Sequence, residues 1–395
     1  MTRRLLLFAA LLALAPLANA DNCDIAQRPA ATLLLPYFEV DLHARDKTTA
    51  EADTSYTIVN VKAAPAIART TIWTDWGYPV LSFNTFLTGY DAQTIDLYDV
   101  LARGNTGVSS SGLADGCAHP EQQVSGLAIL AAEPMLTIGR GASACGATRV
   151  GGTHVHAIGY ATIDVVSNCD TRLPTDPDYF THDLLFDNVL TGDFAQVEPL
   201  AGRSYASSLV HIRALPEGGQ AGANIPSTLG RSFYQRLTPA GYAQTMDRRQ
   251  PLPAQFAARL DRLDDTVVVW REPRVSTCAA ATNFNMALSN IVRFDEHENA
   301  TVFGESVVLL PLPPPGLPPT SAIQAMSSFF PAPAASGDTR GWLYLNLHDT
   351  INNDRPSQNW VIVRSHAGTR TRAIDATPLA DGCAPIVAPG VLPQQ

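Results

Sequence analysis

The chain has 395 residues, a hydrophobic fraction of 46% and a formal net charge of −10. This apolar content is ample for folded cores and argues against disorder, and an acidic chain with no Lys/Arg stripe is a poor partner for nucleic acid. One hydrophobic core usually stops growing at about 250–300 residues, so the length predicts two domains.

Residues 1–20 have the pattern of a secretory signal peptide. A basic start at residues 1–4 precedes an apolar run at 5–17 and an Ala-Asn-Ala cleavage site at 18–20. No later run reaches the roughly 18 apolar residues that a transmembrane helix needs. The mature chain is therefore expected to be soluble and to reside in the periplasm or outside the cell.

Short runs rich in Val, Ile, Thr and aromatic residues follow, separated by Pro, Gly, Asn and Asp, which is typical of antiparallel strands. Strands are expected at residues 31–42, 56–61, 67–76, 80–88, 93–100, 153–166 and 207–214, and a pair of strands broken at Pro134 is expected at 124–138. Pro36 predicts an edge position for the first of them, because proline cannot donate to a sheet. Gly159 is a candidate bulge in the long strand.

The composition changes after the Gly-rich stretch 217–223. Residues 227–263 are expected to form a short helical insertion, because Pro253 suits a first helical turn and Phe256, Leu260 and Leu263 share a helical face. Strands are expected to resume at 266–270, 289–294, 301–310, 341–347 and 358–366. The proline run 311–319 favours polyproline II and predicts a stiff connector.

The predicted fold class is all-β, with two β-sandwich (Ig-like) units at residues 21–222 and 223–395. Segments 341–347, 358–366 and 372–375 repeat the order of 56–61, 67–76 and 93–96. The pentapeptide Leu-Ala-Asp-Gly-Cys ends at Cys117 and again at Cys383. An internal duplication is therefore one hypothesis, and convergence on Asp-Gly turn chemistry is the other.

The six cysteines all follow the predicted signal peptide, and an even number in an exported chain indicates disulfides. They are Cys23, Cys117, Cys145, Cys169, Cys278 and Cys383. The predicted pairing, one of many that six cysteines allow, is Cys117–Cys145, Cys169–Cys278 and Cys23–Cys383.

Several segments resemble those of a family of exported bacterial β-rich proteins that has no assigned activity. They are Phe-Glu-Val-Asp at 38–41, Trp-Thr-Asp-Trp at 73–76, Leu-Thr-Gly-Tyr-Asp at 87–91, Asp-Arg-Arg with Pro at 247–251, Trp-Leu-Tyr-Leu-Asn at 342–346 and Gln-Asn-Trp at 358–360. The resemblance covers most of the mature chain. It implies export and a shared β-rich fold, and it transfers no functional site.

His154 and His156 form the sharpest metal-like pattern in the chain. Residues two apart on a strand project from one face, so the two imidazoles could bind one ion with Tyr160 or Asp164 nearby. A catalytic site would need a third ligand that the sequence does not identify. The alternative is a partly exposed histidine pair on a strand, with no cofactor at all.

Two clusters are candidate ligand-binding sites. Trp73, Asp75, Trp76 and Tyr78 could stack against sugar rings, although β-sandwiches commonly bury tryptophan in the core. Arg248 and Arg249 could anchor an anion, although arginine commonly serves buried ion pairs instead.

Two acidic segments complete the candidates. Asp176, Asp178 and Asp183 could line a calcium loop, because hard cations prefer oxygen ligands, but nearby prolines favour an ordinary rigid loop. Residues 295–298 (Asp-Glu-His-Glu) could hold a cation, but a solvated hairpin turn is the stronger expectation.

Motifs of common enzyme classes are missing from the sequence, including G-x-S-x-G, H-E-x-x-H and phosphate-binding loops. The first hypothesis is therefore an exported, non-enzymatic protein that binds glycan or another envelope or surface protein. The alternative is a secreted hydrolase, metal-assisted through His154, His156 and a carboxylate such as Asp164.

Overall fold

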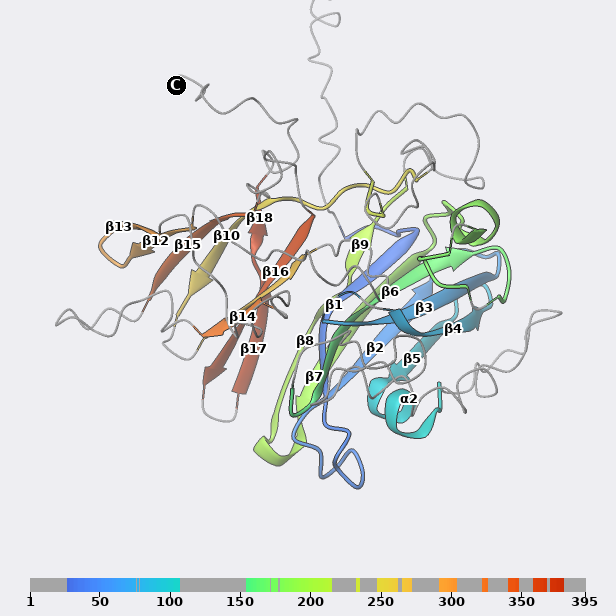
Figure 1. The fold of residues 1–395 in the computed structure, drawn as a ribbon, viewed down its shortest axis with the longest axis horizontal. Helices are drawn as coiled ribbons and strands as arrows, with labels where there is room; N and C mark the ends of the chain where they lie inside the picture. Colours follow the sequence, from blue (N-terminus) through green and yellow to red (C-terminus); the bar gives the residue numbers. More distant parts are fainter. Residues whose placement is uncertain are drawn as a thin grey trace, which may run out of the picture.

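The structure, a computed structural model, describes residues 27–75, 77, 79–106, 154–170, 172–176, 178–214, 232–234, 247–261, 265–271, 291–303, 322–325, 340–347, 358–367 and 370–379. Its regular structure in these ranges is mostly β, arranged in four antiparallel sheets. The predicted all-β class is therefore confirmed. Figure 1 shows strands β1–β9, the N-terminal half, on the right and strands β10–β18, the C-terminal half, on the left.

The N-terminal half contains two sheets. The five-stranded sheet has the order β4–β3–β6–β1–β9, with the bounds Thr32–Val40 (β1), Ala66–Thr74 (β3), Pro79–Leu87 (β4), Ala157–Val166 (β6) and Val210–Ile212 (β9). The four-stranded sheet has the order β5–β2–β7–β8, with the bounds Asp53–Asn60 (β2), Ala92–Asp96 (β5), Leu190–Glu198 (β7) and Arg203–Ser208 (β8). The hydroxyls of Tyr56 and Thr70 meet between the two sheets at 2.8 Å.

Three short helical elements lie in the described residues of the N-terminal half. They are α2 (Leu97–Arg103), the π-helical turn η2 (Tyr179–Asp183) and the 3-10 turn η3 (Pro199–Ala201). Asp96 begins α2 because its side chain accepts a hydrogen bond from the backbone N–H of Asp99. The predicted strand 93–100 is thus wrong in its second part, where this cap converts the chain from strand to helix.

The C-terminal half also contains a five-stranded and a four-stranded sheet. The five-stranded sheet has the order β13–β12–β15–β10–β18, with the bounds Gln255–Leu260 (β10), Ile291–Asp295 (β12), Ala300–Phe303 (β13), Gly341–Asn346 (β15) and Thr377–Pro378 (β18). The four-stranded sheet has the order β14–β11–β16–β17, with the bounds Thr266–Arg271 (β11), Ala322–Ala325 (β14), Asn359–Ala367 (β16) and Arg370–Asp375 (β17). Phe256 and Trp360 pack edge to face between the sheets, with ring centroids 6.0 Å apart.

The two halves have the same strand topology. The order β4–β3–β6–β1–β9 corresponds strand for strand to β13–β12–β15–β10–β18, and β5–β2–β7–β8 corresponds to β14–β11–β16–β17. Gly159 and Gly341 occupy matching positions, because a Cβ on either would overlap a carbonyl oxygen of the adjacent strand, at Trp73 and Phe294 respectively. The repeat is therefore present in the topology, but the alignment predicted from sequence is wrong. Strands β15 and β16 correspond to β6 and β7, not to the strands near 56–61 and 67–76.

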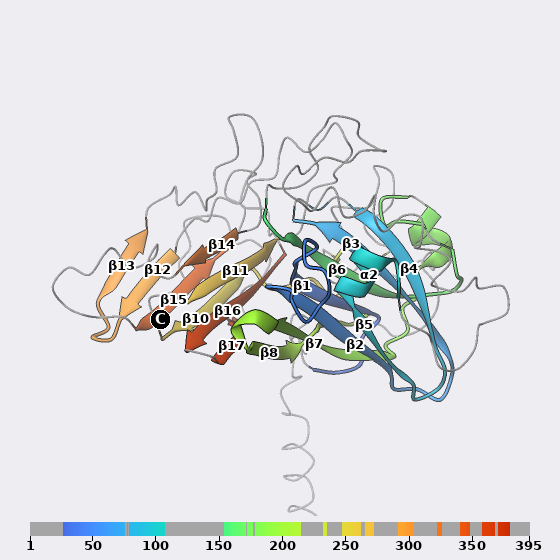
Figure 2. The same cartoon turned by 90° about the horizontal axis from the view of Figure 1, so that it is seen from below.

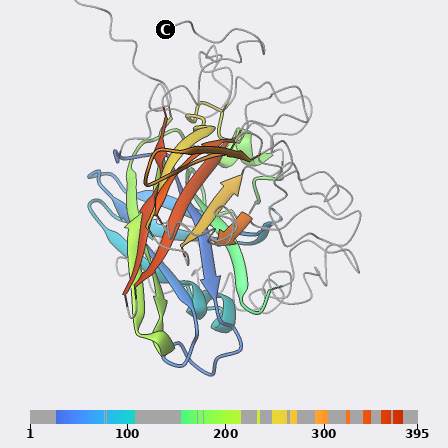
Figure 3. The same ribbon diagram turned by 90° about the vertical axis from the view of Figure 1, so that its left-hand side faces the viewer.

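The halves meet through strands from both. Strands β8 and β17, matching edge strands of the four-stranded sheets, lie side by side (Figure 1, Figure 2). Figure 3 views the molecule from the side of the C-terminal half, whose strands lie in front. Trp270 of β11 packs edge-on against Tyr160 of β6, with ring centroids 5.6 Å apart. The buried hydrophobic residues accordingly form one cluster that includes both halves.

Pro36 does not place β1 at an edge, contrary to the prediction. Strand β1 pairs with β6 along its length and with β9 through Thr32–Leu34, before the proline. The register with β6 shifts between Leu35 and Phe38. Because the regular pairing is interrupted at this point, no sheet hydrogen bond requires the N–H that Pro36 lacks. The strand can therefore remain inside the sheet.

The predicted helical insertion 227–263 is wrong at residues 255–260, which form β10. Phe256, Ala258 and Leu260 are buried and alternate with more exposed neighbours, as in a strand with one face in the core. Residues i and i+4 share a face in both a helix and a strand. The spacing of Phe256 and Leu260 therefore did not distinguish the two.

Some predictions lie outside the described residues: the signal peptide, the strand pair at 124–138, residues 227–231, 235–246 and 262–263 of the insertion, the strand residues 304–310 and the proline run 311–319. Cys169 is the one cysteine within the described ranges, and it is disulfide-bonded. Its partner lies outside those ranges, so the predicted pairing with Cys278 remains a prediction.

Candidate functional site

Each five-stranded sheet has an outer face, which points away from the four-stranded sheet of the same half. On this face of the N-terminal half, Trp73 and Tyr160 stack with ring centroids 5.6 Å apart and an interplanar angle of 4°. Both rings are buried, and Trp270 lies against Tyr160. Trp73 therefore packs in the core and presents no surface to a sugar ring. Trp76 and Tyr78 lie outside the described residues.

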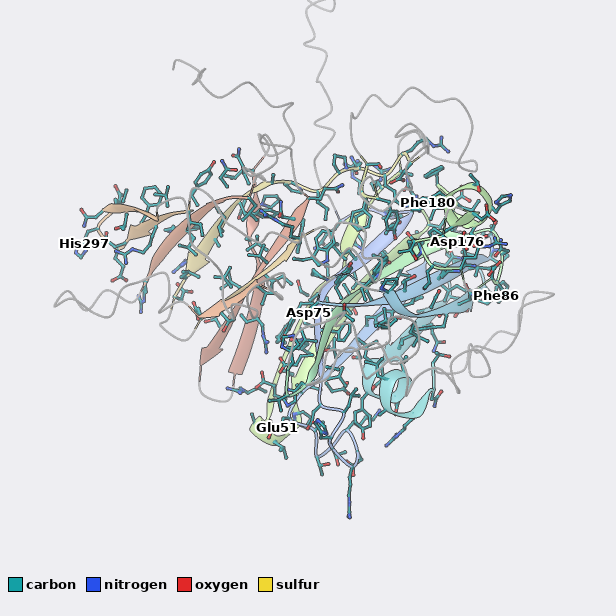
Figure 4. All side chains as sticks on the ribbon, viewed as in Figure 1. Glu51, Asp75, Phe86, Asp176, Phe180 and His297 are labelled. Atoms are coloured by element: carbon teal, nitrogen blue, oxygen red, sulfur yellow. The ribbon has the colours of Figure 1, made fainter. Side chains whose placement is uncertain are left out.

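The predicted metal ligands do not come together. His154 Nε2 donates to Asp75 at 2.8 Å, whereas His156 Nδ1 donates to Glu39 at 2.7 Å. Asp164 belongs to a third cluster. Within the described part of the chain, no group of three or more His, Cys, Asp or Glu side chains is placed to hold a metal ion. Figure 4 shows Asp75 near the middle of the molecule, where the two halves approach each other.

Asp164 lies in a buried polar cluster on the outer face of the N-terminal sheet. Its carboxylate accepts hydrogen bonds from the hydroxyls of Tyr179 (2.6 Å), Tyr234 and Thr32, and Arg249 lies 3.5 Å away. Burial and the charge of Asp164 raise the pKa of Tyr179 and Tyr234 well above its usual value, so both hydroxyls remain donors. The protein itself occupies the oxygens that a metal would need.

The arginine pair at 248–249 is engaged by the protein. Arg249 is fully buried, 3.3 Å from Asp247, and it also donates to the backbone carbonyl of Leu185 at 3.0 Å. Arg248 stacks over Phe186, 4.2 Å from the ring centroid, and burial lowers its pKa. These contacts are those of structural arginines, which was the alternative to an anion site.

The acidic loop after β6 does not gather its carboxylates. Asp183 forms a buried ion pair with Arg69 at 2.6 Å and a second, partly exposed pair with Arg172 at 2.8 Å. Asp176 instead accepts a hydrogen bond from the backbone N–H of Asp178 at 2.9 Å. The three residues of the calcium hypothesis thus have separate local roles, as expected for a rigid loop.

A charged cluster connects the halves. Arg364 of β16 lies between the rings of Tyr37 and Tyr205, 5.6 and 5.4 Å from their centroids, and pairs with Glu39 at 3.4 Å and Glu198 at 3.1 Å. Burial alone would raise the pKa of Glu39, but the hydrogen bond from His156 and the charge of Arg364 outweigh it and lower the value to about 2. The hydrogen bond to Glu39 in turn raises the pKa of His156. His156 is thus committed to an ion pair.

A small cavity of about 30 Å³ lies between β1, β6 and β11, lined by Tyr37, Tyr160 and Trp270 among others. This volume has room for about one water molecule, not for a substrate. This cavity, where described residues of the two halves meet, is therefore too small to bind a substrate.

An open groove of about 780 Å³ lies on the outer face of the five-stranded C-terminal sheet. It is lined by residues at the ends of β10 and β12 and the start of β15: Arg259, Asp261, Phe294, Asp295, Glu296, Glu298, Arg340, Gly341 and Trp342. Trp342 is 49% exposed and faces Phe294 across the paired strands. The groove thus combines an accessible aromatic pair with charges of both signs.

The charged groups of the groove are partly paired. Arg259 Nε lies 2.8 Å from Asp261, and Arg340 lies 3.8 Å from Glu296. Asp295 accepts backbone hydrogen bonds from His297 (2.9 Å) and Asn299 (2.8 Å), and hydrogen bonds from Asn299 lower its pKa. Residues 295–298 therefore form the hairpin turn between β12 and β13 that the sequence predicted, beside the groove.

The aromatic pair of the groove matches the buried pair of the N-terminal half. Counted from Gly159 and Gly341, Tyr160 corresponds to Trp342, and its strand partner Trp73 corresponds to Phe294. The sequence did not single out Trp342 as a site residue. The signal for it was the alternation in 341–346, which places Trp342 on the face of the strand opposite to the buried Leu343 and Leu345.

No family model, no curated protein and no solved structure matches this chain. Across the described ranges, the helices are too short or too polar to span a bilayer.

Proposed function

We propose that this chain is an exported, non-enzymatic protein of the bacterial envelope or extracellular space that acts by binding another surface protein. The aromatic pair in the groove, an exposed Trp342 beside a partly buried Phe294, is the observation that carries the proposal. Aromatic side chains with arginine at the centre of a contact, surrounded by charged groups, are typical of protein–protein interfaces. The predicted signal peptide and the disulfide at Cys169 support export.

We also propose that each half is an Ig-like β-sandwich. The contacts of Tyr56 with Thr70 and of Phe256 with Trp360 support this, because each joins the two sheets of one half. In such a fold the sheets form the scaffold, and faces or loops that remain uncovered provide the binding surface.

A secreted hydrolase remains the alternative. Its support is the sequence pattern of His154 and His156, and it requires a third ligand from outside the described residues. In the described part of the chain, His154 and His156 each bond to a different carboxylate, which favours a structural role.

The test is binding of the mature protein, produced in an oxidising compartment, to envelopes isolated from the producing organism. Three proteins are compared: wild type, Trp342→Ala and the matched control Leu200→Ala, whose side chain is 64% exposed on η3, away from the groove. We expect saturable binding by wild type and the control, and at least about tenfold weaker binding by Trp342→Ala, since aromatic hot spots cost more than about 1.4 kcal/mol.

Two further arms separate the other hypotheses. Competition by purified envelope polysaccharide, and equally by protease-treated envelope fragments, would replace the protein partner with a glycan. A stoichiometric transition metal that is lost in His154→Ala, together with hydrolase activity, would replace the binding function with the enzyme. Equal binding by Trp342→Ala and wild type would contradict the groove as the site.

A further inference from the structure

We infer that the partner in the groove is a second copy of this chain, which inserts Tyr90 and Lys62 against Trp342 and Phe294. The inference rests on the proposed function, because it assigns the partner of the same groove. Two observations support it: the corresponding aromatic pair of the N-terminal half is buried and packs against another aromatic ring, and the N-terminal half has an exposed turn that carries Tyr90.

The N-terminal half shows how an aromatic pair on this face is covered. Trp73 and Tyr160, the counterparts of Phe294 and Trp342, are both buried, and Tyr160 packs at a steep angle against another aromatic ring, that of Trp270 from the following half. The C-terminal half has the corresponding aromatic pair on the same face of its sheet. Within the described residues, no following half covers that pair. The ligand that best fits this aromatic pair is therefore an aromatic side chain presented by another protein unit.

Tyr90 has the properties of such a side chain. It is 73% exposed at the turn between β4 and β5, the most exposed of the large hydrophobic side chains in the described ranges. Its φ of 59° lies in the left-handed region, which is unfavourable for a bulky residue. Strained conformations of this kind are concentrated at functional contacts.

The turn that carries Tyr90 is held rigidly against its neighbour. Asn60, which is fully buried, donates from Nδ2 to the carbonyls of Ala64 (2.7 Å) and Thr88 (2.9 Å). The backbone N–H of Tyr90 donates to the carbonyl of Lys62 at 3.0 Å. A rigid aromatic anchor loses little conformational entropy on binding, so the turn is preorganised for insertion.

The charges of the two surfaces are complementary. Lys62 is exposed next to Tyr90, and no described residue forms an ion pair with it. The groove has two arginines and four carboxylates; Arg259 and Arg340 already pair with Asp261 and Glu296, which leaves Asp295 and Glu298 without an arginine partner among the described residues, beside the aromatic pair. A lysine entering with Tyr90 would meet this excess of negative charge.

The geometry predicts an open chain of molecules. The β12–β13 hairpin with His297 lies at one end of the long axis, and Phe86, on the strand that leads to the Tyr90 turn, lies at the other (Figure 4). A contact between different surfaces at opposite ends is heterologous and does not close on itself in a pair. Each added copy therefore leaves one groove and one Tyr90 turn free.

The test is sedimentation velocity of the full mature protein over a range of concentrations. Wild type and Leu200→Ala should form oligomers that grow with concentration, whereas Tyr90→Ala alone and Trp342→Ala alone should remain monomeric. An equimolar mixture of Tyr90→Ala and Trp342→Ala should form dimers and nothing larger, because only one intact groove and one intact Tyr90 turn can meet. A misfolded variant could not produce this complementation.

Charge reversal supplies a second arm. Lys62→Glu should weaken association by about tenfold or more, and its mixture with Glu298→Lys should recover association. Wild type that stays monomeric at high concentration, or a Tyr90→Ala and Trp342→Ala mixture without dimers, overturns the inference. If envelope binding nevertheless depends on Trp342, the proposed function stands with a different partner; if that dependence is also lost, both fail.

Discussion

The two five-stranded sheets have matching outer faces, but the aromatic pair on one face is buried and the pair on the other lines an open groove. In the N-terminal half, Trp73 is fully buried against Tyr160, and Tyr160 in turn packs against Trp270. In the C-terminal half, the corresponding pair of Phe294 and Trp342 lines an open groove. One topology therefore supports a core position in one half and a binding surface in the other. What differs is the chain that packs on top.

The polar groups of the two faces differ in the same way. Asp164 is buried among Tyr179, Tyr234 and Arg249, whereas its counterpart Asn346 is only partly buried. A buried carboxylate needs partners for its charge, and the segments that cover the N-terminal face supply them. The C-terminal face has no such requirement, because its charged groups remain in contact with water.

The largest expected effect concerns the two tryptophans. Trp73→Ala should lower the free energy of unfolding by about 3–5 kcal/mol, because it opens a cavity in a packed core. Trp342→Ala should change it by less than about 1 kcal/mol, because the side chain is half exposed. Urea unfolding of both variants measures the difference, and similar losses would show that the groove is part of the core.

Substitution of the two matching glycines, Gly159 and Gly341, tests whether they occupy equivalent positions in the two sheets. Gly159→Ala and Gly341→Ala should each destabilise by about 1–3 kcal/mol, because the added Cβ meets a backbone carbonyl that cannot move freely. Urea unfolding again measures the free energy of unfolding of each variant. Gly202→Ala is the control, because an added Cβ there meets no atom within 4 Å and only the φ of 61° opposes the substitution. If only one of the two strand glycines is sensitive, the proposed equivalence of positions fails.

The cluster that joins the halves makes stability depend on acid. The pKa of Glu39 is lowered in the folded protein to about 2, so its contribution is present above its unfolded value of 4.5 and is lost as the pH falls from there toward 2. We expect wild type to lose about 1–2 kcal/mol more than Glu39→Gln over this range. Parallel pH profiles for the two proteins would show that Glu39 is not the group responsible.

The smallest expected effect is at the Tyr90 turn. Tyr90→Gly should leave stability unchanged or raise it by up to about 1 kcal/mol, because glycine adopts a positive φ without strain. The same variant should lose self-association. Thermal unfolding and sedimentation of one sample test both, and a clear loss of stability would mean that the Tyr90 ring packs on its own chain.

The strands themselves were predictable, because alternation in segments such as 81–87 follows directly from one buried face. The sequence also predicted the turn at 295–298. It could not distinguish β10 from a helix, because Phe256 and Leu260 fit both periods, and it wrongly placed β1 at a sheet edge because of Pro36. The difference between Trp73 and Trp342 was beyond local reasoning, since it depends on where Trp270 packs.

The most direct test of the central claim is oxidative footprinting of individual tryptophans at low and high protein concentration, read by mass spectrometry. We expect Trp73 to be protected at both concentrations, whereas Trp342 should be oxidised in dilute protein and become protected as the concentration rises. Protection of Trp342 in the dilute monomer would contradict an uncovered groove. Oxidation of Trp342 that is independent of concentration would contradict its use in self-association.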